Sequence, residues 1–308
     1  MRFPTPLARF RDAGVLHATA FMDRQTLAVQ AMIWMAIAGF LFSVLNLLLR
    51  WSALELSGVQ TQLMRYICGL IVIAPFVFRL GLNAWHPNGI RQQAWRGVVH
   101  TTGLLMWFSA LPFVGMADIT AIGFTQPIFV MLGAMVFLGE KMVPARWIAA
   151  GIAFLGVGIV VAPRLEGAGG LYALILLASA PVFAGSNLIT KVLTRRDRPE
   201  VIVAWQALIV GLFTVPFAIP GWRWPSLSQW ALMLVAGFIG SVGQYCSTRA
   251  MKTADLSATQ TIKFLELIYA ALLGLLAFGD VPSVYTFIGG GVIFGATTWI
   301  ARREMRGR

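Results

Sequence analysis

The chain has 308 residues, of which 58% are apolar and only 12% are charged, and its mean hydropathy is +0.77. Soluble domains carry about 25% charged residues, and a soluble chain of this size cannot bury so much apolar surface. The composition therefore excludes a water-soluble enzyme and a disordered protein. The formal net charge is +12, from 24 Lys and Arg against 12 Asp and Glu. In a membrane protein such an excess indicates on which side the loops lie, rather than a nucleic-acid partner.

The apolar residues fall into segments long enough to cross a bilayer, which requires about 20 residues per helix. Short segments with Gly, Pro, Asn and charged residues separate them. About ten spans are predicted by this criterion, over residues 27–49, 59–78, 95–113, 117–138, 144–162, 170–192, 200–219, 228–249, 255–278 and 282–301. Because the connections are short, we expect an all-α polytopic membrane protein whose consecutive helices are antiparallel neighbours.

The basic residues separate by side when the N-terminus is placed in the cytoplasm and the spans alternate. Nineteen of the 24 then fall on the inner side, and only Arg50, Arg164 and Arg223 fall on the outer side, while Arg65 and Lys263 lie within spans. Cytoplasmic loops of membrane proteins are enriched in Lys and Arg. The bias predicts an even number of spans, with both termini cytoplasmic. We expect the protein in a bacterial-type inner (plasma) membrane.

The two halves of the chain end in similar patterns. The segment MADITA at 116–121 matches TADLSA at 253–258, and QPIFVMLGA at 126–134 matches ELIYAALLG at 266–274. FLGE and AFGD follow at the corresponding positions, then a proline and a glycine-rich helix. Each half holds about five spans, and an odd number per half reverses the orientation of the second half.

We therefore expect two inverted five-helix repeats, a pattern typical of secondary transporters. The predicted divisions are a basic cytoplasmic arm at 1–26, a first repeat at 27–162, a second repeat at 163–304 and a cytoplasmic tail at 305–308. The arm lacks the apolar core of a signal peptide.

In these features the chain resembles the drug/metabolite transporter superfamily, in its EamA-type branch. The resemblance rests on the helix of Arg65 and on the runs FTQPIFVMLGAMVFLGE at 124–140, FLELIYAALLGLLAFGD at 264–280 and FIGGGVIFGATTWIARRE at 287–304. It implies a transporter of a small organic metabolite, and the last run is most similar to uptake members for riboflavin and S-adenosylmethionine. Pro127 keeps the family's helix-breaking position in the first half. Leu267 replaces the family's frequent Pro in the second half, so the sequence does not support a break there.

Three charged residues lie clearly within spans, where a charge needs a partner or a water-filled cavity. Lys263 and Glu266 are three residues apart on one predicted helix and can pair. The pair is either a structural ion pair or a charged cavity wall in which Glu266 changes its protonation. Arg65 either holds helices together through backbone carbonyls or meets a substrate carboxylate, and a structural or gating role is favoured slightly.

Uncharged polar and aromatic residues complete the set of substrate-cavity candidates. His100 is either a hydrogen-bonded packing residue or a cavity wall, with Trp107 two turns further on to stack on a planar ligand. Amides within spans either join helices or face a ligand; the candidates are Gln126, Asn187, Gln206 and Gln244. Pro127 removes a backbone N–H beside Gln126, and a broken helix at mid-depth frees carbonyls for a ligand.

The leading hypothesis is a secondary active transporter that moves an amino acid or related solute by alternating access, through a central cavity between the repeats. The alternative is uptake of a riboflavin- or S-adenosylmethionine-like metabolite by the same fold. Its partners are then the substrate and the bilayer, without nucleic acid, and with proton coupling through Glu266 as a further hypothesis. The sequence has no HExxH, GxSxG or cysteine–histidine cluster, so no catalytic residue, metal or cofactor is expected. A scaffold, a channel and an intramembrane enzyme remain the weaker alternatives.

Overall fold

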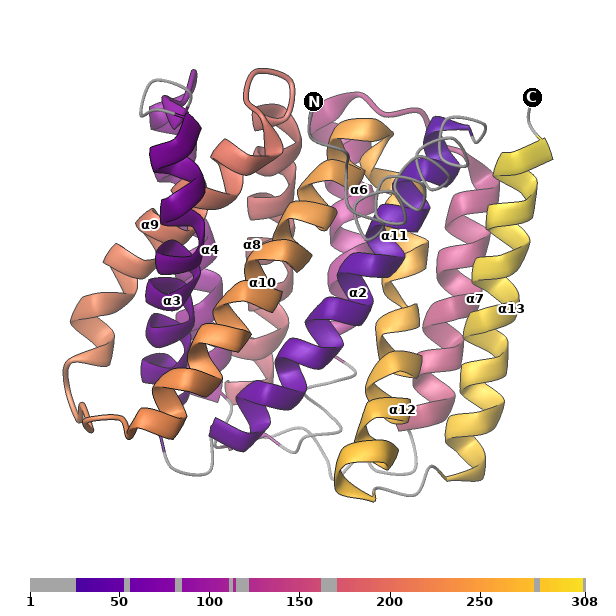
Figure 1. Ribbon diagram of the computed structural model, residues 1–308. Coiled ribbons are helices and arrows are strands. Elements are labelled where there is room, and N and C mark those ends of the chain that lie inside the picture. The colour runs from indigo at the N-terminus through magenta and orange to yellow at the C-terminus, as the bar shows by residue number, and fades with distance from the viewer. Residues whose placement is uncertain are drawn as a thin grey trace, which may run out of the picture.

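The computed structural model describes residues 26–52, 56–80, 85–110, 113–114, 122–161, 171–279 and 283–306. This part of the chain is helical and contains no strand, and its helices form one bundle (Figure 1). Almost all of the expected arm, the whole MADITA segment and the last two residues of the tail lie outside the described residues.

The first unit consists of α2 (Leu27–Ser52), α3 (Gly58–Leu80), α4 (Ile90–Ala110), α6 (Gln126–Leu138) and α7 (Pro144–Val161). The second consists of α8 (Leu171–Leu193), α9 (Pro199–Ala218), α10 (Leu227–Thr253), α11 (Leu256–Lys263), α12 (Leu265–Phe278) and α13 (Val284–Arg306). Each predicted span therefore corresponds to a helix, except that the ninth is divided into α11 and α12.

Six helical stretches of the described chain are long and apolar enough to cross a membrane: most of α2 and α8, all of α9, α10 and α13, and α11 joined with α12. Helices α6 and α7 contain shorter apolar segments. The expected spans 59–78 and 95–113 form α3 and α4 but are not among these six. In α4 the reason is a polar stripe of Gln93, Arg96 and Thr101, which is buried against neighbouring helices.

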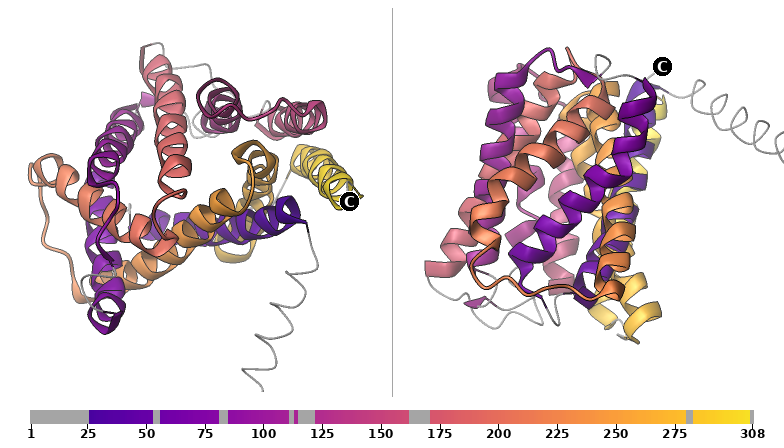
Figure 2. Two further views of the ribbon diagram at one scale, coloured as in Figure 1. Left: turned by 90° about the horizontal axis from the view of Figure 1, so that it is seen from above. Right: turned by 60° about the vertical axis from the view of Figure 1, so that its left-hand side comes forward.

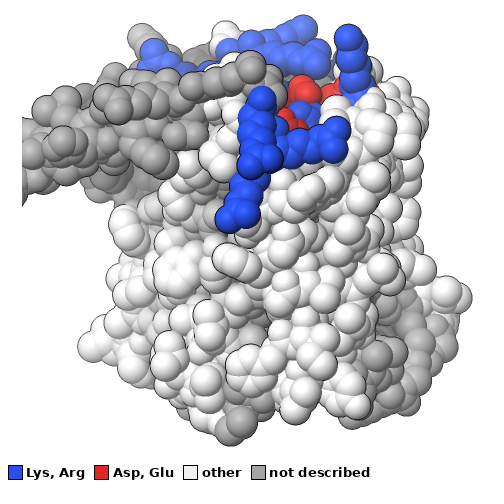
Figure 3. Space-filling view, turned by 90° about the vertical axis from the view of Figure 1, so that its right-hand side faces the viewer, with Lys and Arg blue, Asp and Glu red and all other residues white. Residues whose placement is uncertain are grey.

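The outer sides of the bundle are apolar. Leu155, Leu212, Leu276 and Phe287 expose between 66% and 81% of their surface. The side shown in Figure 3 is white along most of its height, with Lys and Arg gathered at one end. Soluble monomers rarely expose such continuous apolar surface, whereas a bilayer solvates it. The prediction of an all-α polytopic membrane protein is confirmed.

The main helix contacts between the two units have counterparts in which the equivalent helices of the other unit take part. Helix α2 packs on α10 as α8 packs on α4, and α12 packs on α2 as α6 packs on α8. The second helices of the units, α3 and α9, contact each other, and so do the last helices, α7 and α13. In Figures 1 and 2, α3, α4 and α9 form one side of the bundle, and α7 and α13 form the other. The predicted pair of inverted five-helix repeats is therefore present.

Small residues allow several of these helices to approach closely. A Cβ added at Gly156 of α7 would lie 2.8 Å from the carbonyl oxygen of Gly289 in α13. A Cβ added at Gly237 of α10 would lie 2.6 Å from the backbone nitrogen of Gly69 in α3. Such contacts provide van der Waals packing in a medium that supplies no hydrophobic driving force between helices.

The fourth span of each unit is interrupted at the equivalent place. In the first, a turn at Phe124 and Thr125 precedes α6, and Pro127 lies in the first turn of that helix. In the second, Phe264 separates α11 from α12, with φ −64° and ψ −19°. The rings of Phe124 and Phe264 stack with centroids 5.9 Å apart. The break at Phe264 therefore forms although Leu267 stands where the family frequently has proline.

Both ends of the described chain lie at the same end of the bundle. The Thr26 hydroxyl donates to the backbone carbonyl of Glu304 over 3.4 Å. We call this end, which is uppermost in Figure 1, the terminal end.

Candidate functional site

A small polar cavity lies between α3, α9 and α10. Its lining includes Arg65 and Tyr66 of α3, Gln206 of α9, and Ser241 and Gln244 of α10. Its volume is about 20 Å³, enough for roughly one water molecule. Three residues predicted from the sequence, far apart in the chain, thus meet at one cavity on the contact between the two units.

Arg65 lies against α10 without an acidic partner. Its Nε donates to Gln62 Oε1 over 2.9 Å, and its guanidinium carbon lies 4.3 Å from the centroid of the Tyr66 ring. An added Cβ at Gly240 would lie 2.7 Å from Arg65 Nη1, so the absence of a side chain at Gly240 makes room for the guanidinium. In the described part of the chain Arg65 forms neither an ion pair nor a hydrogen bond to a backbone carbonyl. Its terminal nitrogens therefore remain available at the cavity.

Arg96 supports this cavity from α4 although it does not line it. The side chain is buried, and its Nη1 donates to the carbonyl of Ile202 over 3.1 Å. Its Nη2 donates to Gln206 Oε1, while its Nε is buried without a partner. Arg96 is one of the nineteen basic residues expected on the inner side, but its side chain lies inside the bundle. The spacing of Gln93, Arg96 and His100 at three and four residues was the available signal, because it places them on one helix face.

His100 joins three helices beside the cavity. Its Nε2 lies 3.3 Å from the Tyr66 hydroxyl and its Nδ1 lies 3.3 Å from Ser186 Oγ. The Phe183 ring packs edge-on against it, with centroids 5.4 Å apart. His100 therefore contacts a residue of the cavity wall and is itself hydrogen-bonded on both ring nitrogens.

Trp107 and Asn187 lie apart from this cavity. Trp107 packs in an apolar cluster with Ala110 and Leu176, and its ring lies 3.1 Å from an added Cβ at Gly123. Asn187 is half-buried on α8, and its side chain has no hydrogen-bond partner among the described residues. His100 and Trp107 therefore do not line the same cavity.

A second polar cluster lies where the two helix breaks meet. Lys263 Nζ, at the end of α11, donates to Gln126 Oε1 at the start of α6 over 3.4 Å. The backbone carbonyl of Glu266 accepts a hydrogen bond from Ser43 Oγ of α2 over 3.2 Å. Among the described residues no ion pair joins Lys263 to Glu266. The expected pairing assumed one continuous helix, and the turn at Phe264 lies between the two residues.

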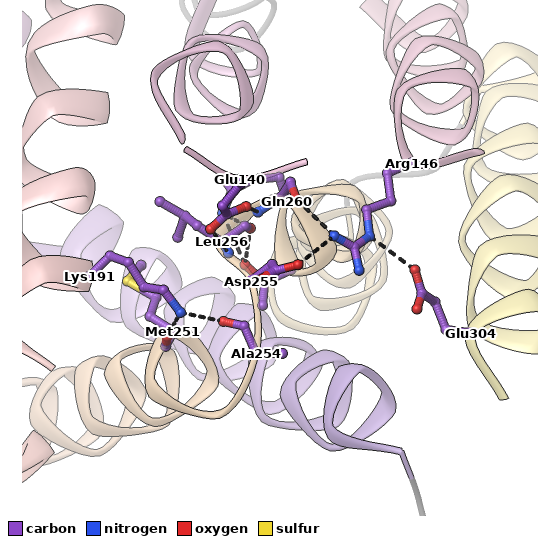
Figure 4. A network of polar contacts seen from close by, with 11 residues as sticks. Glu140, Arg146, Lys191, Met251, Ala254, Asp255, Leu256, Gln260 and Glu304 are labelled. Atoms are coloured by element: carbon purple, nitrogen blue, oxygen red, sulfur yellow. Dashed lines mark hydrogen bonds and ion pairs between the residues drawn. The ribbon is translucent and has the colours of Figure 1, made fainter. Parts of the chain in front are cut away.

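At the terminal end a network of polar contacts joins the two units (Figure 4). Arg146 of α7 contacts Glu304 Oε1 over 3.0 Å through Nε, and Asp255 Oδ2 over 3.1 Å through Nη1. The same Nη1 donates to Ser257 Oγ over 3.0 Å. The Arg146 side chain is only 9% exposed, so its charge depends on these carboxylates.

Two further charges of this network hold the turn between α10 and α11. Glu140 accepts hydrogen bonds from the backbone N–H groups of Leu256 (2.6 Å) and Ser257 (3.0 Å), at the N-terminus of α11. Lys191 Nζ donates to the carbonyls of Met251 and Ala254, both over 2.6 Å, at the C-terminus of α10. The helix dipole favours the Glu140 carboxylate at the N-terminus of α11 and the Lys191 ammonium at the C-terminus of α10. The sequence analysis used Arg146 and Lys191 only as topology markers and missed this network.

Comparisons with known proteins cover nearly the whole chain. The profile of the EamA-like transporter family matches residues 29–162 and 170–302. A riboflavin transporter of Rhizobium johnstonii is 33% identical over 294 residues, which cover 94% of this chain and 97% of that protein.

More distant relatives carry other substrates in their names. An S-adenosylmethionine uptake transporter of Rickettsia bellii is 24% identical over 89% of this chain and 94% of that protein. A pseudopaline exporter of Pseudomonas aeruginosa is 26% identical over 87% of this chain and 94% of its own length. A solved crystal structure superposes with a TM-score of 0.77 at 20% identity, covering 91% of this chain and 99% of that one, and so shares the fold.

Proposed function

Because the chain belongs to the EamA-like transporter family, we propose that it is a secondary active transporter that takes up a riboflavin-like metabolite by alternating access. The observation that carries the substrate class is the full-length similarity to a riboflavin transporter. The sequence analysis placed amino acids first, and the relatives favour its alternative, a riboflavin- or S-adenosylmethionine-like solute. The named relatives are transporters, which supports the expectation that the chain is not an enzyme.

The substrate path in this proposal runs along the contact between the two repeats, residues 27–162 and 163–304. The polar residues at this contact support it: Arg65, Gln206 and Gln244 at one cavity, and Lys263 with Gln126 at the helix breaks. Polar groups within a membrane protein are costly unless they pair or serve a solute. A cavity of about 20 Å³ cannot hold a metabolite, so substrate entry requires the helices around it to separate.

The network at the terminal end is the closed gate in this proposal. Arg146, Asp255 and Glu304 join the last helix of the first repeat to the second repeat, and must separate for the path to open on that side. We assign this end to the cytoplasm because its Lys and Arg residues, gathered as in Figure 3, follow the positive-inside rule. Both termini are then cytoplasmic.

Uptake of labelled riboflavin into proteoliposomes that contain the purified protein tests the proposal. We expect accumulation above that of empty liposomes, with competition by excess unlabelled riboflavin. S-adenosylmethionine distinguishes the two substrates of the alternative. If the protein is folded and no riboflavin enters under any imposed ion gradient, the riboflavin assignment is wrong.

A further inference from the structure

We propose that the cavity between α3, α9 and α10 is a subsite selective for hydrogen-bond acceptors. It binds the part of the substrate that presents oxygen acceptors, a ring carbonyl edge or a carboxylate. The inference rests on the proposed function, because the recognised group belongs to the transported metabolite. It adds the chemistry that the site selects and the residues that impose the selection.

The charge around the cavity is positive and uncompensated. Arg65 lines the cavity, and Arg96 reaches it through Gln206. No carboxylate lines the cavity, and neither arginine forms an ion pair in the described part of the chain. Cations held inside a membrane bundle need a compensating group, and a substrate oxygen supplies one.

The hydrogen-bonding groups that remain free at the cavity are mostly donors. An arginine can only donate, so the Arg96 contact identifies the Gln206 atom it meets as the acceptor oxygen Oε1. The Gln206 NH₂ group is thus the part left for a ligand. Arg65 uses its Nε on Gln62 and keeps its two terminal nitrogens. Gln244 and Ser241 also line the cavity, and neither side chain has a hydrogen-bond partner among the described residues.

Arg96 acts as a positioning residue for this subsite. Its two contacts tie the Gln206 amide and the Ile202 carbonyl of α9 to α4. Its own Nε has no hydrogen-bond partner among the described residues. The arrangement presents the donor end of the amide and hides its acceptor end.

This donor surface distinguishes between parts of a metabolite. The pyrimidinedione edge of a flavin and the carboxylate of an amino acid both offer oxygen acceptors, which arginine and amide N–H groups bind well. Sugar hydroxyls both donate and accept, so they gain less from a wall of donors. We therefore expect the carbonyl edge of riboflavin, rather than its ribityl chain, to bind at this cavity.

The Gln206→Glu substitution tests the inference most directly. A glutamate still accepts from Arg96 and forms an ion pair with it, so the fold is retained, but the cavity loses its amide donor and gains a charge that repels acceptors. Riboflavin binding to the purified protein, followed by quenching of riboflavin fluorescence, should weaken roughly ten-fold or more. The thermal midpoint without ligand should stay equal or rise.

Thr214→Val is the matched control on the same helix. Thr214 is buried on α9 and is not among the residues that line the cavity. Within the described part of the chain its hydroxyl bonds only to the carbonyl of Val210, one turn earlier. This variant should bind riboflavin as the wild type does. Gln206→Leu, which abolishes both ends of the amide, should lose binding and also lower the thermal midpoint, because Arg96 is left without its partner.

Small probes separate failure of the subsite from failure of the proposed substrate. Acetate and uracil carry the two kinds of acceptor group, and ribitol carries only hydroxyls. Acetate and uracil should raise the thermal midpoint of the wild type and leave that of Gln206→Glu unchanged, and ribitol should have no effect on either. If riboflavin is not transported but these shifts occur, the riboflavin assignment fails and the subsite stands. Equal shifts in wild type and variant, or no shift with any probe, would overturn the subsite.

Discussion

Breaking the Arg146–Glu304 contact should open the terminal end of the transporter. The two side chains are 9% and 18% exposed, whereas the other carboxylate on Arg146, that of Asp255, is 55% exposed. Breaking a buried pair costs about 3–5 kcal/mol, and an exposed pair contributes about 0–1 kcal/mol. Glu304 is partly exposed, and a glutamine in its place still accepts one hydrogen bond, so we expect Glu304→Gln to destabilise the closed gate by about 2 kcal/mol. Because Asp255 is more exposed, Asp255→Asn should destabilise it by less than ~1 kcal/mol.

Cysteine labelling measures this shift. Thr259 lies on α11, about one turn after Asp255 of the network, and is fully buried. The two native cysteines are buried as well. A Thr259→Cys protein should react slowly with a membrane-impermeant maleimide applied from the terminal side. Adding Glu304→Gln should raise the rate roughly thirty-fold, and Asp255→Asn by no more than about five-fold. Arg302→Gln, which removes an exposed charge from the same end, is the control and should leave the rate unchanged.

A double-mutant cycle checks that the contact itself is responsible. Arg146→Met and Glu304→Gln combined should raise the labelling rate less than the product of their separate effects, because both remove one interaction. The reasoning is refuted if Glu304→Gln labels at the rate of the Arg302→Gln control, or if Asp255→Asn has the larger effect.

Three further outcomes follow from the packing and the helix breaks. Gly237→Ala should lower the thermal midpoint more than Gly240→Ala. A Cβ at position 237 would meet the backbone of α3, 2.6 Å away, whereas a Cβ at position 240 would meet an arginine side chain that can move. A greater loss in Gly240→Ala contradicts this order. Lys263→Ala and Glu266→Gln should reduce riboflavin flux more than the amount of folded protein in the membrane, and Glu266→Gln should also remove any dependence of flux on an imposed pH gradient; equal losses of flux and protein would indicate a structural role. Leu267→Pro should be tolerated, because residue 267 lies in the first turn of α12. The free energy of unfolding should fall by about 1 kcal/mol, for the one hydrogen bond that the Leu267 N–H donates to Phe264. Failure to fold would show that this turn needs its N–H.

The sequence was most informative where the bilayer imposes a simple requirement. A spanning helix needs a long apolar segment, and α2, α9, α10 and α13 were predicted to within a few residues for that reason. Helix α4 was placed less well, because its polar stripe faces α8 and α9, and average hydropathy cannot show which side of a helix is buried.

The candidate site was only partly predictable. Residue type singled out Arg65, Gln206 and Gln244, since polar groups within spans are costly, but their meeting depends on how α3, α9 and α10 cross. Arg96 was missed because a basic residue near the start of a span looks like a loop charge. The spacing of Lys263 and Glu266 assumed one continuous helix, whereas a turn lies between them and the Lys263 ammonium donates to Gln126.

What the sequence determined by itself was the class of molecule: the number and order of the spans, the two repeats and the family, all of which follow from local composition and from the similarity of the two halves. What only the tertiary structure decided was which polar groups share a cavity, which charges join the two repeats at the terminal end, and that α11 and α12 separate without a proline. Those properties depend on contacts between residues more than a hundred positions apart, such as Arg96 with Gln206 and Arg146 with Glu304. Such contacts are set by the packing of whole helices against one another and leave no periodic signal along the chain.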